Sequence, residues 1–266
     1  MSYKSFLIPA LLDASEIARN YFGKTTAQLK KDNTVVTEAD FAVGAFLVAA
    51  VKKEYPLHNI VDEERGVIDN ASDFTWVIDP IDGTSNFAAG VPLYGILLGL
   101  LYKDKPVAGG IALPPFYRIY TAEKGGGAFC NGERIYTTRE KKLADVIVAY
   151  GFNSSFGATE ITIQEDAMAF TRLKYKSRGI RMTMNIFDPM MVAEGGFGVW
   201  MSRSTKIWDN VATHCILEEA GCLYTDFYGN PIDYSNWRYD TEKKFTVCTA
   251  NPELHADTQK IIHSDV

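Results

Sequence analysis

Two carboxylates stand directly after a run of apolar residues at 76–78, in the stretch DPIDG at 79–83. The apolar run predicts a buried strand, and aspartate, proline and glycine close together predict a turn that ends it. Thr84 and Ser85 then favour the start of a short helix. Carboxylates bind hard cations such as Mg²⁺, and the free N–H groups of Gly83 and Thr84 at a helix start bind phosphate. This short segment therefore has the chemistry to hold a metal phosphate.

Carboxylates recur at two other predicted element boundaries. Residues 62–64 read Asp-Glu-Glu and follow a predicted strand at 58–61. Asp209 stands at the start of a predicted helix over 210–220. Taken alone, the first group is typical of a solvated loop and Asp209 is typical of a helix N-cap. In α/β sheets, however, ligand sites form where strands end and helices begin.

These separate acids make chemical sense as one site. If the fold brings them together, the chain offers four carboxylates and one free backbone carbonyl, from Glu63, Asp79, Asp82, Asp209 and Ile81. Four clustered carboxylates would repel one another strongly without a cation. They suit about two or three Mg²⁺ ions, an arrangement that serves phosphoryl transfer.

The remaining elements predict a chain in two parts. Amphipathic helices are expected at 3–22 and 39–55, the second with Thr37 as N-cap and Asp40 completing a capping box. Two hairpins follow, with strands expected at 94–102, 106–113, 118–123 and 127–135. Strands then alternate with helices, which are expected at 160–173, 185–195, 209–221 and 252–263. We therefore predict an N-terminal α+β domain at 1–137 and a C-terminal α/β domain at 138–266, which completes the site.

Composition narrows the class of protein. The chain has 266 residues, is 47% hydrophobic and carries a net charge of −6, which is typical of a globular protein and does not favour a nucleic-acid or membrane partner. The four cysteines show no zinc spacing. No signal peptide or membrane span is predicted, so we expect a cytoplasmic protein.

Two long motifs resemble signatures of the inositol monophosphatase superfamily. DPIDGTSNF at 79–87 is similar to its first signature, and WDNVATHCILEEAG at 208–221 is similar to its second. TEAD at 37–40, the acids at 63–64 and the glycine-rich hairpin at 125–132 agree in order and spacing. The resemblance implies a layered α-β-α-β-α sandwich, α+β or α/β in class, of the inositol monophosphatase and fructose-1,6-bisphosphatase type. It also implies a homodimer with Mg²⁺-dependent, Li⁺-sensitive phosphomonoesterase activity.

The resemblance also implies a role for each site residue. Glu63, Asp79 and the Ile81 carbonyl would bind the first metal, and Asp79, Asp82 and Asp209 the second, with a weaker third ion on Glu63. Three residues would be catalytic: Glu63 and Thr84 would orient the attacking water, and Asp40 would accept a hydrogen bond from the Thr84 hydroxyl and polarise it. The N–H groups of Gly83 and Thr84 would hold the phosphate.

The substrate is less clearly indicated. The inositol enzymes carry a glutamate shortly before the second signature, and here that segment contains Ser202, Arg203 and Lys206 but no acid. Candidate substrate contacts are Asp82, Asn185, Ser202 and Arg203. If Arg203 faces the site, alone or together with Arg178 and Arg181, it favours a second anionic group on the substrate.

Several activities remain open. The leading expectation is hydrolysis of a small phosphorylated metabolite, inositol-1-phosphate or a related sugar or polyol phosphate. The alternatives are a fructose-1,6-bisphosphatase, a 3′-phosphoadenosine nucleotide phosphatase or a histidinol-phosphate phosphatase. A non-catalytic binding protein of the same fold is the remote alternative, although none of the expected metal ligands has been lost.

Overall fold

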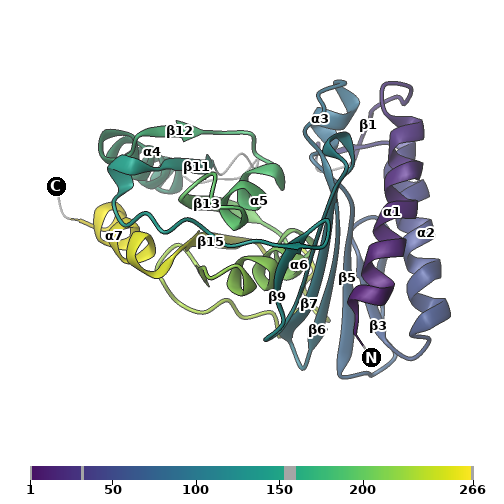
Figure 1. The fold of residues 1–266 in the computed structure, drawn as a ribbon. Coiled ribbons are helices and arrows are strands. Elements are labelled where there is room, and N and C mark those ends of the chain that lie inside the picture. Colours follow the sequence, from purple (N-terminus) through teal and green to yellow (C-terminus); the bar gives the residue numbers. More distant parts are fainter. Residues whose placement is uncertain (1, 31–32, 153–159, 265–266) are drawn as a thin grey trace.

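Residues 2–30, 33–152 and 160–264 are described by the computed structural model, and they stack in five layers (Figure 1). The α-helices among them are α1 (Lys4–Tyr21), α2 (Glu38–Glu54), α3 (Thr84–Ala88), α4 (Glu160–Lys176), α5 (Phe187–Ala193), α6 (Ile207–Glu219) and α7 (Pro252–Ile262).

The strands form two large sheets and one small ribbon. The larger sheet has the order β10-β9-β8-β7-β6-β5-β3-β4, and its strands are β3 (Asn59–Asp62), β4 (Gly66–Ile68), β5 (Phe74–Asp82), β6 (Gly95–Tyr102), β7 (Lys105–Leu113), β8 (Arg118–Glu123), β9 (Gly127–Cys130) and β10 (Glu133–Arg134). The second sheet has the order β12-β11-β13-β15-β14, and its strands are β11 (Ile147–Gly151), β12 (Gly179–Arg181), β13 (Val199–Thr205), β14 (Leu223–Thr225) and β15 (Phe245–Ala250).

The helices cover the sheets as the apolar patterns predicted. The buried side chains of α1 include Leu7, Leu11 and Ala18, which lie on one face and pack with α2 against the larger sheet. Helices α5 and α6 lie between the two sheets, and α4 and α7 cover the far face of the second (Figure 1). The expected α-β-α-β-α sandwich is therefore confirmed.

Helix α6 lies very close to the larger sheet. A Cβ atom at Gly109 of β7 would stand 2.6 Å from the carbonyl oxygen of Ala212, so only glycine permits this approach. The largest hydrophobic cluster joins residues of both sheets around this helix, Val77 and Trp200 among them. The division at residues 137 and 138 into two domains stays a prediction.

One local expectation was wrong. The strand at 76–78 does not stop before the acids: β5 continues to Asp82, with an irregularity in its pairing with β6 between Asp79 and Asp82. Pro80 cannot donate a ladder hydrogen bond, and such a bulge accommodates it. The segment before Thr37, for which no element was predicted, forms a short antiparallel ribbon of β1 (Gln28–Leu29) and β2 (Val35–Val36).

None of the described helices has the length and apolar character that crossing a bilayer requires.

Candidate active site

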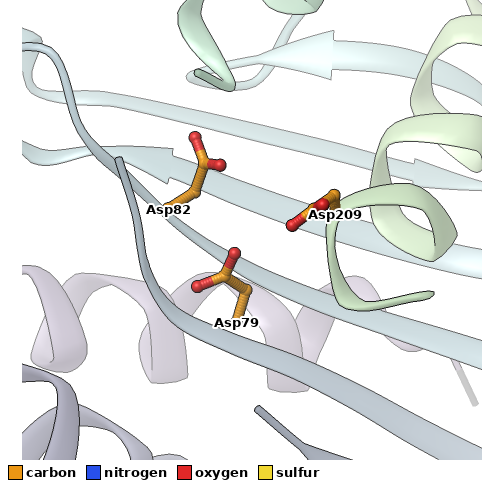
Figure 2. Close-up of side chains that lie close together, drawn as sticks. All are labelled: Asp79, Asp82 and Asp209. Atoms are coloured by element: carbon orange, nitrogen blue, oxygen red, sulfur yellow. The ribbon is translucent and has the colours of Figure 1, made fainter. Parts of the chain in front are cut away.

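Three aspartates from distant parts of the chain meet between the two sheets. Asp79 and Asp82 come from the end of β5, and Asp209 comes from the first turn of α6 (Figure 2). One carboxylate oxygen of each lies within 4.8 Å of the others, and Asp79 is buried. The sequence therefore predicted correctly that these three acids lie together.

The bulge in β5 explains how two residues of one strand can share a site. Residues three apart point to opposite faces of a regular strand. The irregularity between Asp79 and Asp82 interrupts this alternation, so both carboxylates lie in one cluster with Asp209 (Figure 2). The backbone N–H of Ile186 then donates to Asp82 Oδ2 and fixes that carboxylate.

Asp209 is positioned by its own helix. It is not the N-cap that the sequence suggested: α6 begins at Ile207, and Asp209 reaches back to accept from the backbone N–H of Lys206 at 2.7 Å. That hydrogen bond uses Oδ2 of Asp209. A carboxylate in the first turn is also favoured by the positive end of the helix dipole.

Sequence reasoning missed Asn210, which anchors the same turn. Its fully buried Nδ2 donates to the Lys206 carbonyl at 2.6 Å and to Thr205 Oγ1 at 2.9 Å. Its Oδ1 accepts from the Tyr224 hydroxyl at 2.7 Å. These bonds tie the start of α6 to β13 and β14, and therefore hold Asp209 in place. Nothing in the spacing of the motif distinguished Asn210 from its neighbours.

The electrostatics of the three aspartates call for a cation. Burial, and then the charges of Glu63, Asp82 and Asp209, raise the pKa of Asp79 well above its usual range. Burial and the neighbouring carboxylates raise the pKa of Asp82 and of Asp209 to about 7. The buried Oδ1 of Asp79 has no hydrogen-bond partner among the described residues. Carboxylate oxygens are the ligands that hard divalent cations prefer, and a buried carboxylate oxygen without a hydrogen-bond donor is free to bind one.

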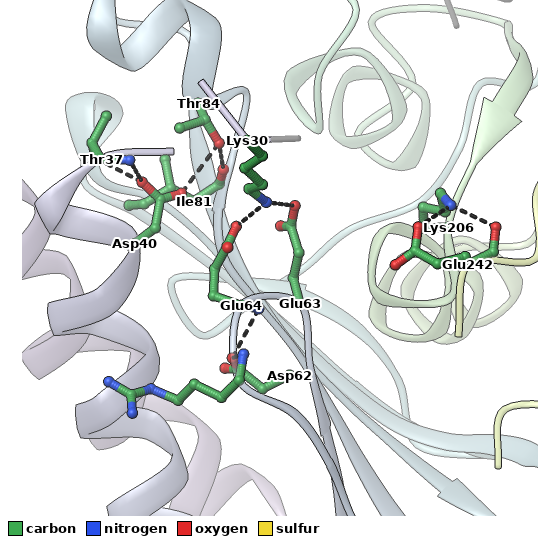
Figure 3. Close-up of polar contacts among 11 residues, drawn as sticks. Lys30, Thr37, Asp40, Asp62, Glu63, Glu64, Ile81, Thr84, Lys206 and Glu242 are labelled. Atoms are coloured by element: carbon green, nitrogen blue, oxygen red, sulfur yellow. Dashed lines mark hydrogen bonds and ion pairs between the residues drawn. The ribbon is translucent and has the colours of Figure 1, made fainter. Parts of the chain in front are cut away.

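Glu63 lies near this cluster but is held by a lysine. Lys30, from the β1–β2 ribbon, places its Nζ 3.2 Å from Glu63 and in a short contact with Glu64 (Figure 3). Burial raises the pKa of Glu63 to about 8, even though Lys30 opposes this. Burial also disfavours the charge of Lys30, yet Glu63 and Glu64 raise its pKa above the usual value. The sequence did not indicate Lys30, because it stands in a polar stretch with no metal-binding pattern.

Asp40 and Thr84 are in contact, as expected. The Thr84 hydroxyl lies 3.2 Å from Asp40 Oδ1 and 2.8 Å from the Ile81 carbonyl oxygen, and its single proton can be donated to one of them at a time (Figure 3). The other oxygen of Asp40 accepts from the backbone N–H and hydroxyl of Thr37 at 2.8 and 2.6 Å. Asp40 therefore closes the capping box of α2 and also faces Thr84. Burial raises its pKa, against the Thr37 hydrogen bonds.

Gly83 has a conformation and surroundings that exclude other residues. Its φ is +82°, and an added Cβ would lie 2.9 Å from the Leu93 carbonyl oxygen and 3.3 Å from the Asn185 Cβ. The Asn185 amide also donates to the Leu93 carbonyl, and its Oδ1 accepts from Phe187 N–H at 3.0 Å. The expected helix at 185–195 begins two residues later, at Phe187, with Ile186 as its N-cap.

A pocket of about 140 Å³ opens beside the aspartates. Its lining includes Asp82, Asn185, Ser202 and Asp209. Three of the four expected substrate contacts therefore border it, together with two expected metal ligands, since Asp82 was expected in both roles.

The fourth expected substrate contact, Arg203, is not in this lining. Its guanidinium is buried and lies 2.8 Å from Glu165 Oε2 and 3.3 Å from Asp166 Oδ1, above the Phe227 ring at 3.9 Å. Consecutive residues of a strand face opposite sides, and Ser202 takes the side of the pocket. Arg203 therefore faces away from the pocket, and the expectation that it faces the site was wrong.

Comparison with known proteins agrees with this arrangement. The model of the inositol monophosphatase family matches residues 2–264. A fructose-1,6-bisphosphatase/inositol-1-monophosphatase of Aquifex aeolicus is 32% identical over 85% of this chain and 86% of its own length. A Nus factor SuhB of Pasteurella multocida is 32% identical over 80% of each chain. The crystal structure of suhB from Bartonella henselae shares the fold, with a TM-score of 0.88 over 100% of both chains at 22% identity.

The fold, the aspartate cluster and these matches define a phosphoric monoester hydrolase. The chain belongs to the inositol monophosphatase family.

The raised pKa values predict how the metal-free protein responds to pH. An aspartate titrates near 3.9 in an unfolded chain, whereas Asp82 and Asp209 titrate at about 7 in the folded one. Between these values the folded state binds more protons, so the free energy of unfolding should fall as pH rises toward about 7. We expect the Tm in chelator to be lower at about pH 8 than at about pH 5, and we expect Mg²⁺ to restore it.

The control for this prediction is Asp209→Asn, which removes one of the titrating groups. Its metal-free Tm should depend less on pH than that of the wild type. Equal pH dependence in the two proteins would contradict the assignment of the effect to this cluster.

Proposed function

We propose that the protein is a Mg²⁺-dependent phosphomonoesterase that hydrolyses a small phosphorylated metabolite, inositol-1-phosphate or a related sugar or polyol phosphate. One observation carries this proposal: three carboxylates lie within 4.8 Å of one another, and a buried oxygen of Asp79 has no partner among the described residues. A bound cation would neutralise these clustered carboxylates. The chain belongs to the inositol monophosphatase family, and a cation bound here would serve phosphate ester hydrolysis.

The proposed ligands follow the resemblance and the geometry together. Asp79, Asp82 and Asp209 would hold one ion; Glu63, Asp79 and the Ile81 carbonyl would hold another, and Glu63 a weaker third. When bound, Mg²⁺ would supply charge for the phosphoryl oxygens and lower the pKa of a water molecule. Glu63 would take part once Lys30 releases it, since the ammonium and a metal ion compete for the same carboxylate.

The chain's own groups would hold and orient the reactants. The Thr84 hydroxyl and Glu63 would orient the attacking water, and Asp40 would accept a hydrogen bond from the Thr84 hydroxyl, whose oxygen lies 3.2 Å from Asp40 Oδ1. The backbone N–H groups of Gly83 and Thr84 would hold the phosphate.

Four further properties are proposed from the family alone: that the ion is Mg²⁺, that Li⁺ inhibits, that the protein forms a homodimer and that it acts in the cytoplasm.

A second candidate is a binding role without turnover. It is considered because several relatives carry the name Nus factor, which is not the name of an enzyme. Phosphate release separates the two. The test measures release with Mg²⁺ from inositol-1-phosphate, fructose-1,6-bisphosphate, 3′-phosphoadenosine-5′-phosphate and histidinol phosphate. Turnover of any of these that Asp209→Asn abolishes supports the enzyme. No turnover of any of them by a folded, Mg²⁺-loaded protein favours the binding role.

A further inference from the structure

We propose that Asp188 is a positioning residue of the Mg²⁺ site. It holds the backbone of residues 183–186 in one conformation, and that segment fixes Asp82 and forms one wall of the pocket. The inference rests on the proposed function, because it takes Mg²⁺ as the ion that Asp82 binds.

Asp188 is a fully buried acid in the first turn of α5, outside the aspartate cluster. Its Oδ2 accepts from the backbone N–H of Thr183 at 3.1 Å and from that of Met184 at 3.3 Å. Burial raises the pKa of Asp188, against these hydrogen bonds. Its Oδ1 is buried and has no hydrogen-bond partner among the described residues. Burying a carboxylate with an unpaired oxygen lowers stability, so stability alone does not explain an acid at this position.

The two hydrogen bonds hold a turn that is unfavourable by itself. Met184 has a φ of +55°, in the left-handed region that residues other than glycine rarely adopt. Such a conformation persists where its surroundings hold it, and it occurs mostly at functional sites. Asp188 accepts from the N–H of Met184 and from that of the residue before it, so it is placed to hold this turn.

The turn brings the next residues to the site. The N–H of Ile186 donates to Asp82 Oδ2, and Asp82 is one of the three clustered aspartates. Residues 184–186 also line the pocket. A continuous chain of contacts therefore runs from Asp188 through the turn to a proposed metal ligand.

This chain of contacts predicts that the affinity for Mg²⁺ depends on Asp188. Groups that orient a metal ligand without touching the metal commonly change affinity or activity by about tenfold to a hundredfold. Thermodynamic linkage makes the coupling reciprocal, so if the turn favours Mg²⁺ binding, bound Mg²⁺ stabilises the turn.

Two variants of similar size test the role of the acceptor oxygen. Asp188→Asn keeps an oxygen that can accept from both N–H groups, whereas Asp188→Leu has none. We expect Asp188→Leu to raise the Kd for Mg²⁺, measured by titration calorimetry without substrate, by about tenfold or more. Asp188→Asn should keep most of the wild-type affinity. A folded Asp188→Leu with an unchanged Kd overturns the inference.

Asn59 provides a matched control, because it anchors a loop near the start of β5, whereas Asp82 lies at the end of that strand. It is also fully buried, and its Oδ1 accepts from the backbone N–H groups of Asn70 at 2.8 Å and Ser72 at 3.2 Å. Asn59→Leu should therefore lower the Tm but leave the Kd for Mg²⁺ unchanged. Equal weakening of Mg²⁺ binding in Asn59→Leu and Asp188→Leu would show a general effect of lost stability and reject the inference.

The reciprocal effect can be measured in the wild type, so this test does not require any variant to fold. Amide hydrogen exchange at 183–186 should slow when Mg²⁺ is bound, and exchange at 70–72 should not. Unchanged exchange at 183–186 in the Mg²⁺-loaded protein overturns the inference. A protein that shows the coupling but releases no phosphate from any tested ester rejects the proposed function alone, so the two failures are distinguishable.

Discussion

Replacing Asp209 with asparagine should lower kcat/KM for phosphate release by roughly a hundredfold to a thousandfold or more, which is the order of loss for one preorganised electrostatic group. The change removes a charge from a cluster whose oxygens lie within 4.8 Å of one another, so a cation bound there loses a ligand. Folding should survive, because the remaining amide oxygen can still accept from Lys206 N–H. Steady-state kinetics and a melting curve measure the two effects separately.

A matched control lies on the same helix. Glu218 is an acid of α6 that pairs with His214 at 3.2 Å and takes no part in the cluster. Glu218→Gln should leave kcat/KM within about threefold of the wild type, as expected for a partly exposed charge outside the site. Comparable losses in the two variants, or near-normal activity in Asp209→Asn, would contradict the assignment of the site.

Thr84→Ala and Asp40→Asn should each slow the chemical step by about a hundredfold or more, and the double variant should be little worse than either. The reason is their 3.2 Å contact: if Asp40 acts through the Thr84 hydroxyl, removing one member leaves the other without a role. Single-turnover kinetics at saturating substrate isolate this step from binding. Losses that multiply in the double variant would show that the two residues act independently.

The second role of Asp40 needs its own control, because its other oxygen accepts twice from Thr37. Thr37→Ala removes the side-chain part of that capping interaction and leaves the contact with Thr84 intact. It should cost about 1 kcal/mol of stability with little change in rate. A rate loss in Thr37→Ala as large as that in Asp40→Asn would mean that capping, and not contact with Thr84, explains the effect of Asp40.

Much of the site could be predicted because its acids occur in short, dense motifs. Asp79 and Asp82 are separated by only two residues, and Asp209 stands at a clear strand-to-helix change. What the sequence could not show is the bulge in β5, which places both acids of one strand on the same side. Pro80 signalled an interruption, and we interpreted it as the end of the strand.

The expectation for Arg203 could have been limited from the sequence alone. Ser202 and Arg203 are neighbours, and if the segment is a strand they cannot both face the substrate. Which of the two faces inward depends on α4, whose acids Glu165 and Asp166 attract the guanidinium. The pairing of Lys30 with Glu63 lay beyond prediction for a related reason, since it depends on how the β1–β2 ribbon folds over the site.

The measurement that tests the central claim most directly is the rate of phosphate release as Mg²⁺ is added back to chelator-treated protein. Since the cluster brings together carboxylates that burial and mutual repulsion penalise, the account predicts no turnover in chelator and saturable recovery with Mg²⁺. In Asp209→Asn, the same titration should recover little activity at any Mg²⁺ concentration. Full turnover in excess chelator would contradict the account.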